Sequence, residues 1–357
     1  MNEDMLKRLA LLSALKDAEN AQGESDGAGS ELCIMSVREA ATLFDTNGGD
    51  GNGRFSRQLA AYILEPEHHV YGNADDYHNM IAGYLQFGDY YTALQICNFA
   101  LKRFPFSVDI LANAIQAAGQ AGLFEAGEAY INQARKIDMK YWNWRLFLFT
   151  VVYYQSLLNS CDSREIGPVY EQGLQIARDY QRYLPMDERG YNKEAELLLF
   201  ANDRAKAKQV LTHAIFDKIL IDGESVNLIA AQCCVTMLDD ILDDTEEYDL
   251  IIKVAQKGIK NTAQEQPSSR IGYFVYRSAL AKDALVVKEA YGNRAKIEEA
   301  LTEYQCAYDL NQSIGYAKTI SERYAILCQN ARSPIENLPL KKRPLVVIEH
   351  MKSQNSD

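Results

Sequence analysis

The sequence lacks an apolar run long enough to cross a membrane, and its N-terminus lacks the basic start of a secretory signal. A membrane-spanning helix needs about 18 or more apolar residues in succession, whereas the run at 9–15 is short and is closed by Lys16 and Asp17. The chain begins Met1-Asn2-Glu3-Asp4, which is acidic where a signal peptide is basic. We therefore expect no membrane partner and a cytoplasmic location.

A disulfide framework and a cluster of positive charge are missing as well. The seven cysteines have no regular spacing, which favours a reducing compartment. The formal net charge is −12, and the basic residues are scattered apart from Lys341, Lys342 and Arg343. Because binding to phosphates requires clustered cations, we expect no direct nucleic-acid partner.

Motifs for catalysis, metal binding and nucleotide binding are also lacking. His68 and His69 follow a proline and read as exposed loop residues, although loop histidines are able to converge on a metal ion. The loop 45–56 has the composition of a calcium loop, but neither possible register places its ligands correctly. Cys233 and Cys234 are neighbours in an apolar stretch, which indicates packing. We expect no enzyme, no cofactor and no metal.

Two segments of the chain match each other at a spacing of 34 residues. The first carries Tyr84, Gly88, Tyr90, Ala93, Cys97 and Ala100, and the second carries Ala118, Gly122, Phe124, Gly127, Ile131 and Ala134. The glycine and the aromatic residue after it are kept, and the closing positions stay small. A fixed period of this size indicates an array of stacked helical hairpins, whose product is a binding surface.

The stretch 77–105 resembles a tetratricopeptide repeat. Tyr77 stands for the usual Trp and Met80 for the usual Leu, and the direct matches are Tyr84, Gly88, Tyr90, Ala93, Ala100 and Pro105. Ile81 departs from the pattern, which prefers Gly, and the later hairpins keep mainly the small residues. The resemblance implies an all-α fold, a right-handed superhelix that binds proteins or peptides in a concave groove.

The expected organisation follows from caps, prolines and glycines. We expect an amphipathic N-terminal helix at 1–20, a flexible linker at 21–35, a helical extension with a Gly-rich loop at 36–73, the repeat array at 74–331 and an extended tail at 332–357. Ser36 and Glu39 form a capping box. The first helix either caps the array or docks in a groove, in cis or on a partner.

Within the array, the pattern predicts six hairpins and a closing helix. The clearest expected helices are 75–87, 90–103, 169–183, 225–242, 248–261, 272–291, 294–310 and 314–329.

The inward-facing positions on the first helix of each hairpin predict which residues line the groove of the array. They hold His78, Asn113, Gln116, Arg145, Phe149 and Tyr153. Some tetratricopeptide proteins bind acidic chaperone tails through several cationic side chains. This set has only one side chain that is always positively charged, that of Arg145. The expected groove is therefore neutral and aromatic rather than a carboxylate clamp.

A dense acidic patch is the second candidate surface. It comprises Asp239, Asp240, Asp243, Asp244, Glu246 and Glu247. It is either a solvated helix end or a docking point for a basic partner, such as the chain's own 341–343. The adjacent apolar segment 345–348 either folds back on the array or adds as a strand to a partner's sheet.

These observations predict a non-catalytic protein–protein interaction scaffold, an adaptor or regulatory subunit of a complex. The alternative is a peptide-sensing tetratricopeptide regulator that controls an effector protein. Such sensors often carry a helix-turn-helix or a compact bundle at the N-terminus, and residues 1–64 are broken by glycines.

Overall fold

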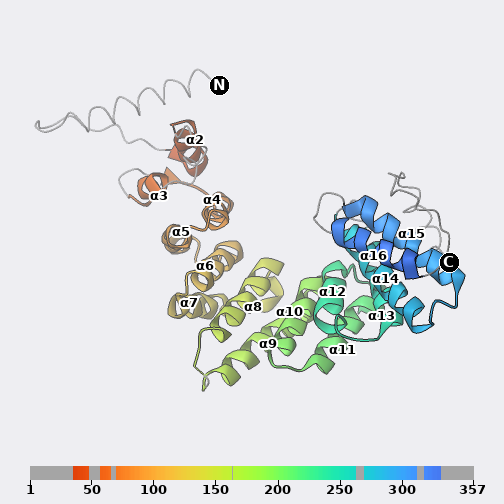
Figure 1. Cartoon of the computed structure of the whole chain (residues 1–357). Coiled ribbons are helices and arrows are strands. Elements are labelled where there is room, and N and C mark those ends of the chain that lie inside the picture. The colour runs from red at the N-terminus through yellow and green to blue at the C-terminus, as the bar shows by residue number, and fades with distance from the viewer. Residues whose placement is uncertain are drawn as a thin grey trace, which may run out of the picture. The chain divides into compact units, whose positions relative to one another are not determined.

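The computed structural model describes residues 35–47, 57–65, 70–162, 164–262, 269–311 and 317–330 (Figure 1). The described chain is built of consecutive helical hairpins, which confirms the all-α repeat class. It divides into two compact units, unit 1 (Met1–Val169) and unit 2 (Tyr170–Asp357). The expected N-terminal helix, most of the linker and the C-terminal tail lie outside the described residues.

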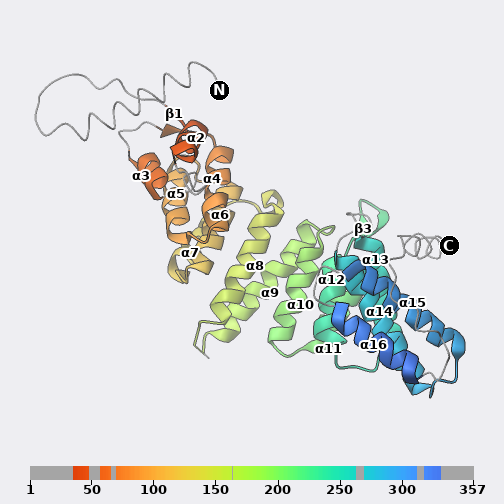
Figure 2. The ribbon, with the colours of Figure 1, turned by 45° about the horizontal axis from the view of Figure 1, so that its top comes forward.

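Unit 1 is a row of hairpins whose first helices lie side by side. Its elements are β1 (Met35–Ser36), α2 (Val37–Asn47), α3 (Arg57–Leu64), β2 (Val70–Tyr71), α4 (Ala74–Gln86), α5 (Tyr90–Arg103), α6 (Val108–Gln120), α7 (Phe124–Ala134), the 3-10 helix η3 (Met139–Tyr141) and α8 (Trp144–Leu158). Helix α4 packs on α6, and α6 packs on α8 (Figure 2). These three helices therefore share one face.

The 34-residue period is realised in helix starts and in turns. Helices α4 and α6 begin 34 residues apart, as do α5 and α7. Gly88 and Gly122 occupy equivalent turns with φ of +76° and +69°. Because L side chains are strained in this region, glycine is the residue that suits both turns. The expected bounds of α5 are confirmed, and those of α4 differ by one residue.

Each first helix of unit 1 begins with a side-chain cap. Asn73, Ser107 and Asn143 accept hydrogen bonds from the backbone of α4, α6 and α8 respectively. Between hairpins, small residues allow close approach. A Cβ added at Gly127 of α7 would lie 2.2 Å from the Tyr153 ring of α8, so the glycine is required by packing.

One further hairpin precedes the repeat that the sequence identified first. The capping box is confirmed, because Ser36 N donates to Glu39 Oε2 at 2.8 Å and Glu39 N donates to Ser36 Oγ at 3.2 Å. Helix α2 packs on α4, and α3 packs on α5. This is the same pairing of first on first and second on second helices, so α2 and α3 extend the array toward the N-terminus. Residues 48–56 of the Gly-rich loop lie outside the described residues.

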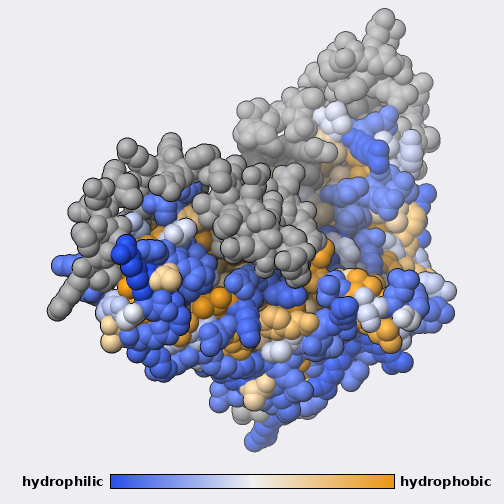
Figure 3. Space-filling model, turned by 90° about the vertical axis from the view of Figure 1, so that its right-hand side faces the viewer, coloured by the Kyte–Doolittle hydropathy of each residue, from blue (hydrophilic) through white to orange (hydrophobic). Residues whose placement is uncertain are grey.

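Unit 2 contains most of α9 (Ile166–Tyr183) and continues the hairpins with interruptions. Its other elements are α10 (Glu188–Phe200), α11 (Arg204–Phe216), β3 (Lys218–Ile221), β4 (Glu224–Asn227), α12 (Ala231–Thr236), the π-helical turn η4 (Met237–Ile241), α13 (Tyr248–Thr262), α14 (Ser269–Lys288), α15 (Arg294–Asn311) and α16 (Ala317–Asn330). Helices α13, α14, α15 and α16 pack in sequence order. The side of the molecule seen in Figure 3 is mainly hydrophilic, with apolar side chains in separate small groups.

The expectation of a helix over 225–242 is wrong in its first part. Residues 218–227 form an antiparallel β-hairpin in which Ile221 pairs with Glu224. Asp222 and Gly223 between them have φ of +50° and +87°. Two positive φ values define the type I′ turn, whose twist matches that of paired strands, and Asp-Gly is one of its preferred sequences. The turn residues therefore override the helical pattern.

The described residues include no helix that could span a membrane.

Cys97, Cys233 and Cys234 are buried, as expected for packing positions. Burial raises the pKa of all three thiols, so they are poor nucleophiles.

Candidate functional site

Three predicted groove residues form one hydrogen-bonded row across the first helices of unit 1. Asn113 of α6 donates from Nδ2 to His78 Nδ1 of α4 at 3.0 Å and to the His78 carbonyl oxygen at 3.3 Å. Arg145 of α8 donates from Nη2 to Asn113 Oδ1 at 2.8 Å. We call His78, Asn113 and Arg145 the ladder, and the surface of α4, α6 and α8 that carries it the ladder face.

The ladder fixes the orientation of its central amide. Asn113 is fully buried, and its oxygen must face Arg145 because a guanidinium only donates. Its nitrogen must then face His78, so Nδ1 of that histidine is the acceptor and carries no proton. Each ladder side chain thus determines the orientation of the next one across three helices.

The Arg145 side chain lies between aromatic rings. Its guanidinium carbon is 5.5 Å from the centre of the Trp144 ring and 5.3 Å from that of Phe149. Such distances allow cation–π attraction, which is stronger where water is excluded. Desolvation lowers the pKa of Arg145 and Asp109 opposes this shift, yet an arginine stays charged at neutral pH. The ladder face thus carries a guanidinium group that is fixed in orientation and has aromatic rings beside it.

The charge state of His78 is set by burial. Desolvation and then the Arg145 charge lower the pKa of His78, and Asp109 partly opposes them. Asp109 also accepts a hydrogen bond from Asn143 Nδ2 at 2.8 Å. The imidazole is therefore neutral at physiological pH, which agrees with its role as acceptor from Asn113.

The other predicted groove residues divide between surface and interior. Gln116 and Phe149 are half-buried. Tyr153, in contrast, is only 1% exposed and donates its hydroxyl to the Phe124 carbonyl oxygen at 2.7 Å. The prediction that Tyr153 lines the groove is therefore wrong, because its ring fills the space left by Gly127 between α7 and α8.

Most of the acidic patch is ion-paired within unit 2. The pairs are Arg277 with Asp239 and Asp243 at 3.5 and 2.5 Å, Lys288 with Glu246 at 3.1 Å, and Lys208 with Glu247 at 2.5 Å. Tyr273 also donates to Asp239 at 2.5 Å. Desolvation, Asp239 and Glu196 raise the pKa of Asp240, which Arg204 opposes. A basic partner would therefore have to compete with cations that are already present. The segment 341–343 lies outside the described residues.

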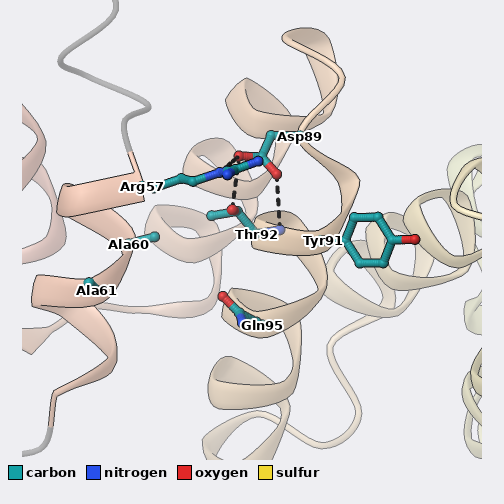
Figure 4. A pocket seen from close by; sticks show the side chains of 7 residues that line it. All are labelled: Arg57, Ala60, Ala61, Asp89, Tyr91, Thr92 and Gln95. Atoms are coloured by element: carbon teal, nitrogen blue, oxygen red, sulfur yellow. Dashed lines mark hydrogen bonds and ion pairs between the residues drawn. The ribbon is translucent and has the colours of Figure 1, made fainter.

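A small hollow of about 370 Å³ lies between α3 and α5 (Figure 4). Arg57 reaches from α3 to Asp89 at 3.3 Å, and Asp89 caps α5 by accepting from Thr92. Desolvation opposes ionisation of Asp89, but hydrogen bonds from Thr92 and Arg57 outweigh it and lower the pKa of the carboxyl group. The Arg57–Asp89 ion pair thus joins α3 to α5, and the Thr92 hydroxyl group is engaged in the cap of α5.

Sequence reasoning missed two contributors to the ladder face. Trp144 and Asp109 both adjoin ladder residues, and each lies in the first turn of a first helix. For Asp109 the signal is its position, one residue after the start of α6, which is the position of Asp75 in α4. The candidate histidine pair of the metal hypothesis, 68–69, lies outside the described residues. Among those described, no cluster of three metal-ligating side chains occurs.

The hairpins of unit 1, with their 34-residue period and glycine turns, give the chain a tetratricopeptide-like fold. No family model matches the chain, and no curated protein matches it. Among solved structures, a thermophilic TPR (tetratricopeptide repeat) protein of Thermus thermophilus is similar at a TM-score of 0.37 and 14% identity. That match covers 71% of this chain and 98% of the other.

Proposed function

We propose that this protein is a non-catalytic interaction scaffold of the tetratricopeptide family, an adaptor or regulatory subunit that binds a protein or peptide on the ladder face. The observation that carries the proposal is the cross-helix row of His78, Asn113 and Arg145. A scaffold whose binding groups are already oriented loses less conformational entropy on association.

The chemistry of the ladder face suits one kind of ligand contact. Arg145 supplies a held donor, and Phe149 and Trp144 supply aromatic surface around it. Tryptophan, tyrosine and arginine dominate the energetics of protein interfaces. The partner we infer places a carboxylate or a backbone carbonyl on Arg145 and an apolar side chain against Phe149.

Affinity purification with matched variants tests this proposal. Arg145→Gln removes the cation and should lower recovery of a stoichiometric partner from the native cell by about tenfold or more, the value of one charged hydrogen bond. Lys102→Gln makes the same charge change at an exposed site on α5 and should leave recovery unchanged. Equal recovery with both variants would remove the ladder face from the binding site.

The absence of catalysis has its own test. Purified protein is incubated with nucleotides and with peptide substrates, and products are followed by mass spectrometry. We expect no turnover above that of heat-unfolded protein. Turnover that survives repeated purification would overturn the scaffold proposal.

A further inference from the structure

The β3–β4 hairpin of unit 2 exposes one strand completely. All four residues of β4, Glu224–Asn227, are exposed. Ile221 and Glu224 flank the two-residue turn and form a hydrogen-bonded pair, so the pairs alternate from there along the two strands. The backbone N–H and C=O groups of Ser225 and Asn227 therefore point away from β3. Among the described residues, no partner is found for them.

Both faces of this hairpin carry exposed apolar side chains. Leu220, which pairs with Ser225, is 69% exposed on one face. Val226 is exposed on the opposite face, whose Ile219 is buried against the body of the unit. Ile229, two residues after the end of β4, is also exposed. Two-stranded hairpins are marginally stable in water, and unpaired edges are usually protected. A third strand would satisfy both requirements.

We propose that residues 345–348 of the same molecule pair with β4 as a third strand. This segment reads Leu-Val-Val-Ile, and β-branched residues favour strands. Side chains of a strand alternate between faces. A segment that is apolar at all four positions therefore lies beside Val226 on one face and beside Ser225 on the other, where it widens the apolar surface that starts at Leu220.

The segment can reach the hairpin. The described part of the chain ends with α16 at Asn330, in the same unit as the hairpin. The stretch 331–344 spans up to ~45 Å when extended. A compact unit of this size is about 40 Å across, so the reach is comparable with the diameter of the unit.

Charge favours the parallel orientation. Lys341, Lys342 and Arg343 directly precede the segment in the sequence. When the segment runs parallel to β4, this triplet lies beside the turn that carries Asp222 and Glu224, both of which are exposed. The antiparallel orientation would place it at the opposite end, next to Lys218 and Asn227.

Amide hydrogen exchange of the full chain, measured by mass spectrometry on peptides covering 223–229, tests the proposal. The variant is Val346→Pro with Val347→Pro, since neighbouring amides point to opposite sides of a strand and proline removes both donors. We expect at least tenfold faster exchange in β4 than in the unchanged chain. The control Val347→Ile keeps strand propensity and should keep the protection. Circular dichroism checks that the helices are retained.

Three outcomes would overturn the proposal. Rapid exchange of β4 in the unchanged chain would mean that nothing pairs with this edge. Slow exchange that survives the double proline variant would identify another occupant. Protection that disappears on dilution, with a change of mass in solution, would assign the occupant to a second copy of the chain.

Discussion

The hairpins of both units stack on one another, but their spacing along the sequence is regular in unit 1 and irregular in unit 2. Helices α4 and α6 start 34 residues apart, whereas α10 and α12 start 43 residues apart because the β-hairpin lies between them. Unit 1 turns on glycines with positive φ, and unit 2 uses Asn202 at the equivalent turn between α10 and α11. Connections between paired helices thus vary while the helices still stack.

What both units keep is a glycine beneath an aromatic ring. Gly127 of α7 lies under Tyr153 of α8, and Gly258 of α13 lies under Phe274 of α14. A Cβ at either glycine would meet the ring at 2.2 or 2.4 Å. In each case the second helix of one hairpin approaches the first helix of the next. The two units therefore share the close approach between neighbouring hairpins, whereas the lengths of their connections differ.

The two units can be observed separately by spectroscopy. The chain has two tryptophans, Trp142 and Trp144, and both belong to unit 1. Tryptophan fluorescence therefore reports unfolding of unit 1, while far-ultraviolet circular dichroism reports both units. If the units unfold independently, a variant in unit 2 should shift only the dichroism transition.

The largest effect is expected from a charge placed in the core of unit 1. Ala100 of α5 is buried, so Ala100→Glu buries a carboxylate without a partner and should cost more than about 4 kcal/mol. Unit 1 should then be unfolded by fluorescence at room temperature. Gln95→Glu adds the same charge at an exposed site of α5 and should leave the transition in place. A normal melting temperature for Ala100→Glu would contradict the repeat register.

A second large effect is expected in unit 2. Asp283 of α14 is buried and accepts hydrogen bonds from Tyr304 of α15 and Arg323 of α16, both at 2.9 Å. Asp283→Ala leaves both donors without this acceptor and should cost about 2–3 kcal/mol, less than a fully buried pair since Arg323 is partly exposed. Urea unfolding followed by dichroism measures the loss.

The control for this variant is Glu298→Ala, which removes an exposed ion pair with Arg294. Surface pairs contribute about 0–1 kcal/mol, so that variant should be close to neutral. If Asp283→Ala also shifted the fluorescence transition, the two units would not unfold independently.

Glycine and cap signals made the regular hairpins predictable from sequence. Pro105 and Gly88 end and turn the helices of the first repeat, so α5 was bounded correctly. The β-hairpin was missed although Asp222-Gly223 is a strong turn signal, because the apolar residues around it also fit a helix. The sequence places the three ladder residues on the first helices of their hairpins, which is where the structure has them. It misplaces Tyr153, because sequence spacing alone does not reveal that Gly127 opens a space for its ring.

A smaller effect should be shared by the units. Gly127→Ala and Gly258→Ala each force a methyl group against an aromatic ring. Overpacking typically costs about 1–3 kcal/mol, and the better helix propensity of alanine returns part of it. We expect a net loss of about 1–2 kcal/mol in each unit, seen by fluorescence for Gly127→Ala only. Gly167→Ala, which has no neighbour within 4 Å, should be neutral or stabilising. Similar results for Gly127→Ala and Gly167→Ala would contradict the packing role.

The smallest effect is a pH dependence specific to unit 1. Desolvation lowers the pKa of His78 below its ordinary value of 6.5, and its Nδ1 accepts from Asn113. The unfolded chain therefore takes up the proton first, so this contribution to stability is complete above pH 6.5 and is lost as the pH falls below that value. Urea midpoints from fluorescence at about pH 7.5 and about pH 5.5 should differ more for the unchanged chain than for His78→Gln. His213→Gln, at an exposed site in unit 2, should leave the fluorescence difference unchanged. Equal pH dependence of the unchanged chain and His78→Gln would mean that the ladder does not exclude the proton.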